Sequence, residues 1–273
     1  MSQPADWYPD PSGRHEHRYW DGSRWTEHVA SHGRQSVDPD LSSKPPPTVA
    51  RPAEKVVRDV AKAGATGVAA GAGGGTVFTE PVLVVNQKAK LIEVNNEYAI
   101  FDANGRQVGA VRQVWQSALK KAARVLTSYD QFMTHKLQVV DMAGNVLLAI
   151  TRPAKIMKSK ILVNDGAGRE LGQVVQQNVF GKIRFALEAG GATVGSINAE
   201  NWRAWNFSIR DHTDTEVARI TKTWEGLAKT MFTTADNYVV QIHRPLEEPL
   251  RSLVVASALS VDTALKQDKR GFN

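Results

Sequence analysis

The sequence predicts a mainly β protein in which a closed antiparallel barrel encloses its own C-terminal helix. Three observations support this fold class. From Phe78 onward, short apolar and polar alternations are separated by Gly, Asn and Asp turns. A hairpin motif recurs through the same region, and an apolar segment long enough for a helix ends it. Closing the strands into a barrel removes the two exposed sheet edges.

The alternation is typical of strands that are buried on one side. In residues 183–188 and 206–210, Phe185 and Phe207 point to one face of the sheet, while Arg184 and Arg210 point to the other. We therefore expect half-buried strands in both segments.

The hairpin motif begins with an acidic residue, which is followed three positions later by a turn residue. Val or Leu follows after three more positions, and the residue directly after it is usually small. Its copies are Asp102-Gly105-Val108-Gly109, Asp141-Gly144-Leu147-Leu148, Asp165-Gly168-Leu171-Gly172, Glu188-Gly191-Val194-Gly195 and Asp211-Asp214-Val217-Ala218. Gly or Asp at the turn position tolerates a left-handed backbone. Each copy thus predicts a strand, a tight turn and a returning strand, and successive copies predict a meander.

The C-terminal segment from Leu250 to Leu265 follows Pro249, a residue that commonly begins helices. Its side chains are apolar or small on all sides, which indicates a buried helix. Such a helix spans about 24 Å, too short for a bilayer and interrupted by Arg251 and Asp262. It is long enough to fill a barrel.

Residues 1–36 form a candidate small β module that is rich in tryptophan and tyrosine. Asp21-Gly22 predicts a hairpin turn between two aromatic strands. Its aromatic residues either pack into a miniature core or form a groove that binds a proline-rich or membrane-associated partner. The residues concerned are Trp7, Tyr8, Tyr19, Trp20 and Trp25.

Residues 37–76 have the composition of a disordered linker, and residues 77–273 form the barrel domain. The linker contains several prolines, a short candidate helix at 54–62 and the tract GATGVAAGAGGG. Such a segment buries too little apolar area to offset its ordering entropy.

The formal net charge is +6, and residues 1–76 hold equal numbers of basic and acidic residues. The excess therefore belongs to the barrel domain and favours an anionic partner. Two basic clusters are candidate contacts with an anionic phospholipid surface: Lys120, Lys121 and Arg124 in one, and Arg152, Lys155, Lys158 and Lys160 in the other. Nucleic acid is not expected, because aromatic residues are not interleaved with these lysines. The alternative is two solvated loops.

Catalysis and cofactor binding have no candidate residues in the sequence. We find no nucleophile elbow or metalloprotease motif, so we expect no enzyme. There are no cysteines, which excludes disulfides and thiolate metal sites and fits a reducing compartment.

Four histidines near the N-terminus are not accompanied by the ordered carboxylates or the cysteines of a metal site, so we expect no metal there. They are His15, His17, His28 and His32. The N-terminus does not have the pattern of a signal peptide.

The hairpin repeats, the terminal helix and the segments 224–229 and 232–238 (WEGLAK and FTTADNY) occur in an order that resembles the phospholipid scramblase family. The resemblance covers residues 78–268. It implies a tubby-like barrel around a central helix and an association with calcium-stimulated movement of phospholipids between leaflets.

The calcium segment of that family aligns with residues 236–247 here, and the match is incomplete. Calcium takes about six to eight oxygen ligands, whereas Asp236, Asn237 and Glu247 supply few. His243 and Arg244 also interrupt the segment, so calcium is not expected as a cofactor. The cysteine-rich palmitoylation stretch of eukaryotic relatives is absent.

The N-terminal string WYPDPSGR at 7–14, with RYWDG at 18–22 and Trp25-Thr26, resembles a short actinobacterial domain of unknown function that is often joined to membrane proteins. This resemblance favours a role near a membrane for the aromatic module.

Two functions follow. The first is a cytoplasmic, peripheral phospholipid-binding protein at the inner face of the plasma membrane, with phospholipid scrambling implied by the family. Scrambling fits a buried helix poorly, because a headgroup needs a polar path through hydrocarbon. The second is a cytosolic, non-catalytic scaffold whose aromatic module binds a partner.

Overall fold

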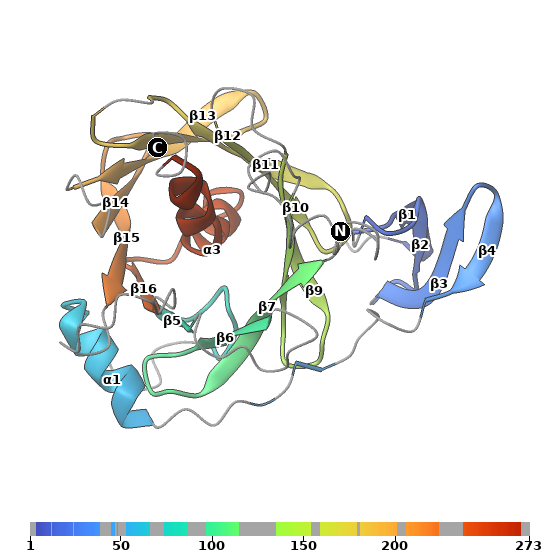
Figure 1. Cartoon of the computed structure of the whole chain (residues 1–273), viewed down its shortest axis with the longest axis horizontal. Helices are drawn as coiled ribbons and strands as arrows, with labels where there is room; N and C mark the ends of the chain where they lie inside the picture. The colour runs from blue at the N-terminus through green and yellow to red at the C-terminus, as the bar shows by residue number, and fades with distance from the viewer. Residues whose placement is uncertain are drawn as a thin grey trace, which may run out of the picture.

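The computed structural model describes residues 4–11, 13–23, 25–38, 45–46, 48, 53–65, 74–86, 97–114, 135–153, 159–178, 181–200, 206–223 and 237–268. The strands of the described part of the chain form two sheets. One is a closed barrel and the other is a four-stranded sheet near the N-terminus (Figure 1).

The barrel is a meander of strands in which every neighbouring pair is antiparallel, and β16 pairs with β5 to close it. This confirms the predicted closed antiparallel barrel. Its strands are β5 (Val82–Asn86), β6 (Glu97–Phe101), β7 (Gln107–Val114), β8 (His135–Val140), β9 (Val146–Arg152), β10 (Lys160–Asp165), β11 (Glu170–Gln176), β12 (Arg184–Ala189), β13 (Ala192–Ala199), β14 (Asn206–Asp211), β15 (Glu216–Thr223) and β16 (Asn237–Ile242).

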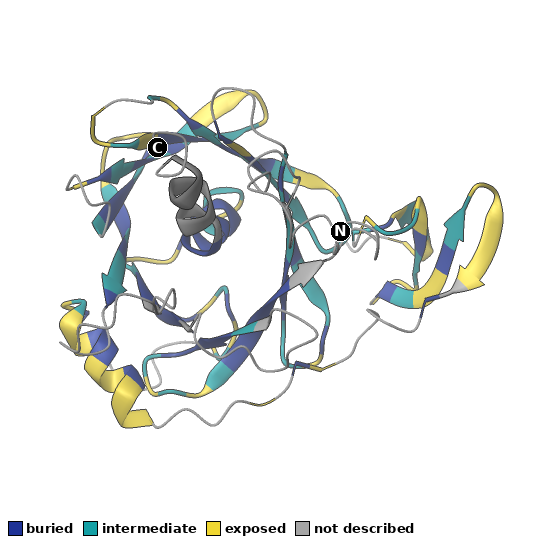
Figure 2. Ribbon diagram, viewed as in Figure 1, coloured by how far each residue is buried: buried dark blue, intermediate teal, exposed yellow. Residues whose placement is uncertain are grey.

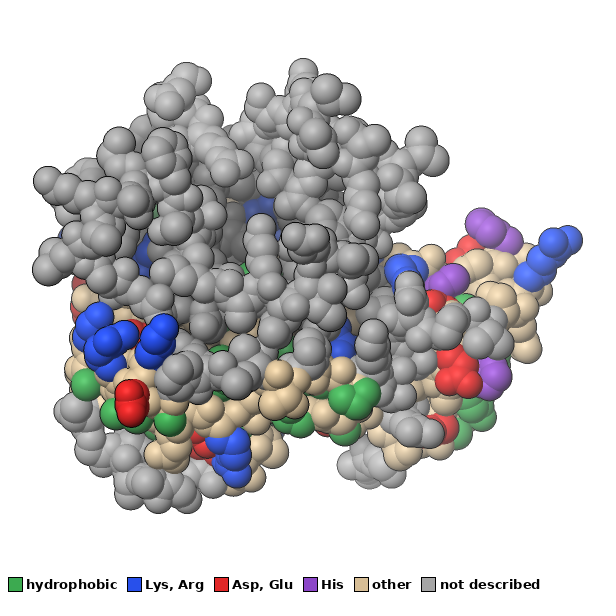
Figure 3. Space-filling view, turned by 60° about the horizontal axis from the view of Figure 1, so that its bottom comes forward, with side chains coloured by type: hydrophobic (Ala, Val, Ile, Leu, Met, Phe, Trp, Pro, Cys, Tyr) green, Lys and Arg blue, Asp and Glu red, His purple; other side chains and the backbone are tan. Residues whose placement is uncertain are grey.

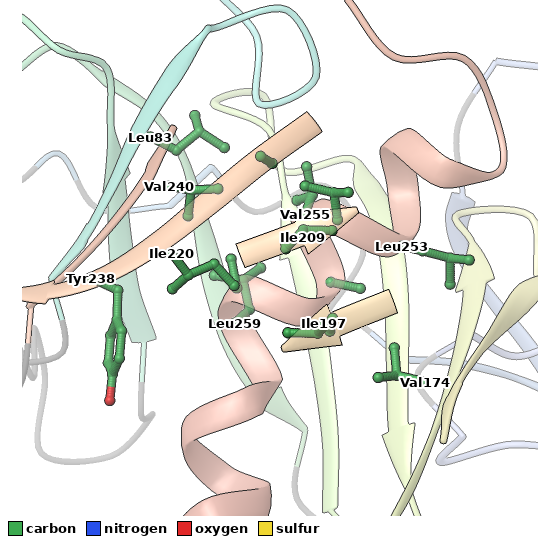
Figure 4. Packing of buried hydrophobic residues seen from close by; sticks show 14 of the residues in the cluster. Leu83, Val174, Ile197, Ile209, Ile220, Tyr238, Val240, Leu253, Val255 and Leu259 are labelled. Carbon is green, nitrogen blue, oxygen red and sulfur yellow. The ribbon is translucent and has the colours of Figure 1, made fainter. Parts of the chain in front are cut away.

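Helix α3 (Leu250–Asp268) lies inside the ring of strands, as the sequence predicts (Figure 1). Its Leu253, Val255 and Leu259 pack with inward-facing strand residues such as Ile197 and Ile209 in one apolar cluster (Figure 4). Leu253 is fully buried. The helix therefore supplies the centre of the barrel core.

The acidic residues of four predicted hairpins cap their own turns. The Oδ1 atoms of Asp102, Asp141, Asp165 and Asp211 accept backbone N–H groups two and four residues later, at 2.8–3.1 Å. The fourth turn residue has positive φ, which suits the glycine found in three of these turns and is also adopted by Asp214. The carboxylate thus satisfies donors that the turn leaves without a strand partner.

The hairpin at Glu188 departs from the predicted motif. Its turn consists of Gly190 and Gly191, both with positive φ, because Ala189 pairs directly with Ala192. The Glu188 carboxylate instead accepts a hydrogen bond from Gln173 Nε2 at 2.6 Å. Two glycines form this turn without a side-chain cap.

The small neighbour in the motif is explained by close strand packing. A Cβ at Gly109 would lie 2.5 Å from the carbonyl oxygen of Val140, the residue before Asp141. A Cβ at Gly195 would lie equally close to the carbonyl oxygen of Arg210, the residue before Asp211. Glycine at these positions permits the next hairpin to approach.

Helix α1 (Ala53–Lys62) lies where the sequence offers a short candidate helix at 54–62, and it packs on the barrel, whereas the surrounding residues 37–76 were expected to form a disordered linker. Val56, Val60 and Ala65 are buried and belong to a second apolar cluster with outward-facing barrel residues, among them Val84 and Phe101. Buried and exposed residues are interspersed along α1 (Figure 2). The Val56 and Val60 spacing gives the helix an apolar face, and the barrel wall supplies a matching surface.

The N-terminal sheet consists of β1 (Asp6–Pro9), β2 (His17–Trp20), β3 (Trp25–Ser31) and β4 (Arg34–Val37), in that order. At its centre, the fully buried Arg18 donates to Asp10 Oδ1 at 2.9 Å and to Asp38 Oδ2 at 2.6 Å. Charge-assisted hydrogen bonds of this kind orient the strands of so small a sheet.

Candidate functional site

The antiparallel meander gives the barrel two chemically different ends. At the turn end lie the tight turns after β6, β8, β10, β12 and β14, together with residues 74–81 and 243–249. At the opposite end, β5, β7, β9, β11, β13 and β15 finish. This topology therefore assigns every charged residue that lies at the end of a strand, or in a connection between strands, to one of the two ends of the barrel.

The turn end is rich in carboxylates. Its acidic residues are Glu80, Asp102, Asp141, Asp165, Glu170, Asp211, Asp214, Glu216, Glu247 and Glu248, and its basic residues are Arg106, Arg169, Arg210, Arg244 and Arg251. Several pairs are formed within this end, including Arg106 with Asp102 and Arg244 with Asp211. Carboxylates remain in excess among the described residues there.

Asp211 is a carboxyl group of this end with a lowered pKa. The hydroxyl of Thr213 lowers its pKa to about 2, with help from the backbone N–H groups of Thr213 and Thr215 and from Arg244, against an opposing effect of desolvation. These donors all stabilise the charged form. Asp211 is therefore a structural carboxylate of the turn.

The opposite end is basic among the described residues. Lys160 and Arg184 begin β10 and β12, and Lys182 lies just before β12; all three are exposed. Exposed Glu200 at this end is paired with Arg219 at 2.7 Å.

Polar side chains also face the barrel interior near this end. Arg152 ends β9 in register with core residues Leu148 and Ile150, so it points inward. Lys222 and Tyr238 are paired on β15 and β16, with the lysine Nζ 5.9 Å from the centre of the ring. Figure 4 shows the Tyr238 hydroxyl directed away from the labelled core side chains.

Two hydrogen bonds between Gln176 at the end of β11 and Ser159 extend this polar region. Gln176 Oε1 accepts the N–H of Ser159 at 3.0 Å, and the N–H of Gln176 donates to the Ser159 carbonyl at 2.9 Å. Both residues are buried. The barrel interior thus changes from apolar around α3 residues 253–259 to polar and cationic near the opposite end.

Of the predicted lipid-binding clusters, Lys160 and Arg152 are described by the structure; Lys160 is exposed, whereas Arg152 is buried. Lys120, Lys121, Arg124, Lys155 and Lys158 lie outside the described residues. The strands that flank them, β7 with β8 and β9 with β10, have their adjoining termini at the opposite end of the barrel. In the chain, both predicted clusters therefore fall between strands that meet at the same end.

The aromatic residues of the N-terminal sheet divide into two groups. Trp7 and Tyr19 are cross-strand neighbours with ring centres 5.4 Å apart, and both are half-buried. Trp25 is buried and packs edge-on against Tyr8 and Trp20. Because Trp7 and Tyr8 are successive strand residues, they point to opposite faces of the sheet.

The candidate metal ligands do not converge within the described part of the chain, where no group of three His, Cys, Asp or Glu side chains could hold an ion. Figure 3 shows histidine side chains of the N-terminal sheet lying apart from one another. Glu247 is exposed at the turn end, whereas Asp236 and the side chain of Asn237 lie outside the described residues.

Sequence reasoning did not select Lys182, Arg184 or Lys222, and it treated Arg152 as part of a loop cluster. Arg152, the Lys182 and Arg184 pair, and Lys222 are far apart in the sequence, and they share one end of the barrel because alternate connections of a meander lie at the same end. In the predicted series of hairpins, the tight turns lie at one end of the barrel and the other connections lie at the opposite end. Assigning each basic residue to one of the two ends in this way would have identified these residues from the sequence.

Comparisons with known proteins identify two regions of the chain. A family model described as Scramblase matches residues 74–265. A second model, described as a protein of unknown function (DUF2510), matches residues 5–47. The two matches coincide with the barrel and with the N-terminal sheet.

Among curated proteins, the chain is 25% identical over 197 residues to Altered inheritance rate of mitochondria protein 25 of Saccharomyces cerevisiae, covering 61% of this chain and 59% of the relative. It is 22% identical over 184 residues to a phospholipid scramblase family protein of Schizosaccharomyces pombe, covering 60% of this chain and 47% of the relative. The chain thus spans about half the length of these relatives.

An X-ray structure of an Arabidopsis thaliana protein is 14% identical to this chain, with a TM-score of 0.41. The match covers 69% of this chain and 99% of that one. In the described part of the present chain, no helix is both long and apolar enough to cross a membrane.

Proposed function

This chain belongs to the scramblase family, and from that premise we propose that it is a peripheral protein that binds anionic phospholipid surfaces at the cytoplasmic face of the plasma membrane. Contact is made by Lys120, Lys121, Arg124, Lys155, Lys158 and Lys160. No chemical step and no calcium ion are needed for this activity.

The observation that supports the proposal best is the charge at the opposite end of the barrel. The described residues there include exposed Lys160, Lys182 and Arg184, with few acidic residues near them. A basic residue close to an anionic leaflet contributes about 1 kcal/mol, so several acting together hold a protein reversibly.

Surface binding is proposed in place of lipid movement because α3 occupies the barrel interior. Leu253, Val255 and Leu259 fill the space around the barrel axis with apolar side chains. A phospholipid headgroup requires polar groups along its path, and these side chains provide none.

Sedimentation with liposomes tests the proposal. We expect the protein to sediment with vesicles that contain phosphatidylserine at low salt, and to be released as salt rises, because charges are screened within about 8 Å at physiological ionic strength. Vesicles of phosphatidylcholine alone are the control. Adding calcium should change little.

The variant with all six named basic residues changed to Gln should lose binding while it keeps the melting curve of the parent. Equal sedimentation of the variant and the parent would refute the lipid-surface mechanism.

A second function is favoured by the half-buried Trp7–Tyr19 pair of the N-terminal sheet. Adjacent aromatic rings of this kind bind proline-rich segments in other small β domains. We propose that this pair binds a proline-rich or membrane-associated protein, as in a scaffold. Changing Trp7 to Ala should remove binding to a proline-rich peptide, whereas changing the exposed His28 to Ala should not.

A further inference from the structure

We infer that the barrel binds a membrane end-on, with the opposite end against the anionic surface and the turn end pointing away from it. This orientation rests on the proposed function and adds to it which part of the barrel meets the lipid. The partner surface is an anionic bilayer, identified by charge complementarity.

The turn end is unsuited to an anionic surface. Glu247 and Glu248 are exposed there, and the turn carboxylates of Asp102, Asp141 and Asp165 are committed to their own turns. Arginines of this end are already paired with those carboxylates, as Arg169 is with Asp165 at 2.7 Å. Bringing these carboxylates to a negative leaflet opposes like charges.

The opposite end presents a basic arc on neighbouring strands, which we define as Lys160, Lys182 and Arg184. Strands β10, β11 and β12 are consecutive neighbours in the barrel, so these residues follow one part of its rim. All three side chains are exposed. An arc of this kind matches the headgroup plane of an anionic leaflet.

A side-on approach is the competing geometry. The exposed residues of α1 include Lys55, Arg58 and Lys62, with Glu54 on the same helix. These three basic residues equal the exposed ones of the basic arc in number, but exposed Glu54 lies among them, whereas Glu200 at the opposite end is paired with Arg219. The electrostatic attraction to a negative surface is therefore greatest at the opposite end.

The absence of cysteine from the sequence permits a direct test by single-site labelling. A polarity-sensitive fluorophore is attached to one of three cysteine variants at exposed positions: Gln177→Cys at the opposite end, Asn104→Cys at the turn end, or Ala61→Cys on α1. Each labelled full chain is mixed with phosphatidylserine-containing vesicles that carry a quencher on the lipid chains.

End-on binding predicts quenching of the label at position 177 and not at 104 or 61. Vesicle binding with quenching at 104 or 61 overturns the orientation and leaves the proposed function standing. Failure of every labelled protein to sediment with the vesicles overturns the proposed function and the orientation together.

Two variants with equal loss of charge provide an independent measurement. The first is Lys160→Gln/Lys182→Gln/Arg184→Gln in the basic arc, and the second is Arg34→Gln/Lys55→Gln/Arg58→Gln elsewhere on the exposed surface. At about fivefold in affinity for each charge near the leaflet, the first should weaken binding on the order of 100-fold. The second should weaken it only a few-fold. Equal weakening by both variants would show that binding follows net charge without a preferred end.

Discussion

Asp211 opens the last of the hairpin turns capped by an aspartate, and its carboxylate is held by more than backbone groups. Thr213 donates its hydroxyl to Oδ1 at 2.6 Å, and Arg244 donates to Oδ2 at 2.7 Å. The latter bond joins the β14–β15 turn to the segment that leads into α3. One side chain therefore connects a local turn to the positioning of the core helix.

This carboxylate should make folding stability depend on acid pH. Its pKa is about 2 in the folded protein and near 3.8 otherwise, so its stabilisation is complete above about pH 4 and is lost as the pH falls towards 2. Urea unfolding at several pH values should show that Asp211→Asn flattens this dependence, since Asn keeps an acceptor oxygen but does not titrate. An unchanged acid profile in the variant would contradict the assignment.

Gly195 is expected to be intolerant of even one added carbon. A Cβ there would meet the Arg210 carbonyl oxygen at 2.5 Å, a backbone atom of a paired strand that cannot rotate away. Gly195→Ala should cost about 1–3 kcal/mol in the free energy of unfolding. Thr193→Ala, at an exposed position of the same strand, is the control and should cost much less. Denaturant titration measures both.

At the scale of elements, the barrel depends on two helices in different ways. Helix α3 fills the interior, where Leu253 has no exposed surface. Helix α1 covers the outer wall over β5, β6 and β16 through Val56 and Val60. The first belongs to the main core, whereas the second is an added layer.

Shortening a core side chain of α3 should destabilise the barrel strongly. Leu253→Ala is expected to lower the free energy of unfolding by about 2–5 kcal/mol, because burial is lost and a cavity is left among the strands. Val57→Ala, at a position 51% exposed on α1, should change it by less than about 0.5 kcal/mol. Similar losses in both variants would argue against a helix at the barrel core.

A charge beneath α1 should detach the helix while the barrel stays folded. Val60→Asp places a carboxylate in the apolar cluster on the barrel wall, and Val57→Asp places the same group in solvent. Hydrogen exchange and limited proteolysis should then show faster exchange and new cuts within residues 53–65 for the first variant alone. Protection of this segment in Val60→Asp would disprove the docking of α1.

At the scale of the whole molecule, the barrel is electrically polarised along its axis. Carboxylates of the turns gather at one end, and Lys160, Lys182 and Arg184 lie at the other. The net charge of +6 does not describe this distribution, because it is a sum over the whole chain, in which the acidic turn end and the basic opposite end partly cancel. An oriented charge distribution directs the approach of the protein to a charged surface more effectively than a uniform one.

The meander and its terminal helix could be predicted from the sequence because their signals are local. Alternation over a few residues marks a strand, an aspartate before a positive-φ glycine marks a turn, and a uniformly apolar segment marks a buried helix. Residues 183–188 and the turn at Asp165 illustrate this, since both have the structure that neighbouring residues predict. The hairpin at Glu188 differs because two successive glycines form a turn without the acidic cap.

Tertiary structure alone decided the features that depend on residues far apart in the chain. The candidate helix at 54–62 packs on the barrel because Val84 and Phe101 offer an apolar wall, and this docking is not revealed by the composition of the segment. The aromatic residues near the N-terminus divide into two groups because adjacent strand residues face opposite sides. The sequence by itself determined which elements form. The closed antiparallel barrel determined which charged residues share an end, because alternate strands of the meander finish at the same end.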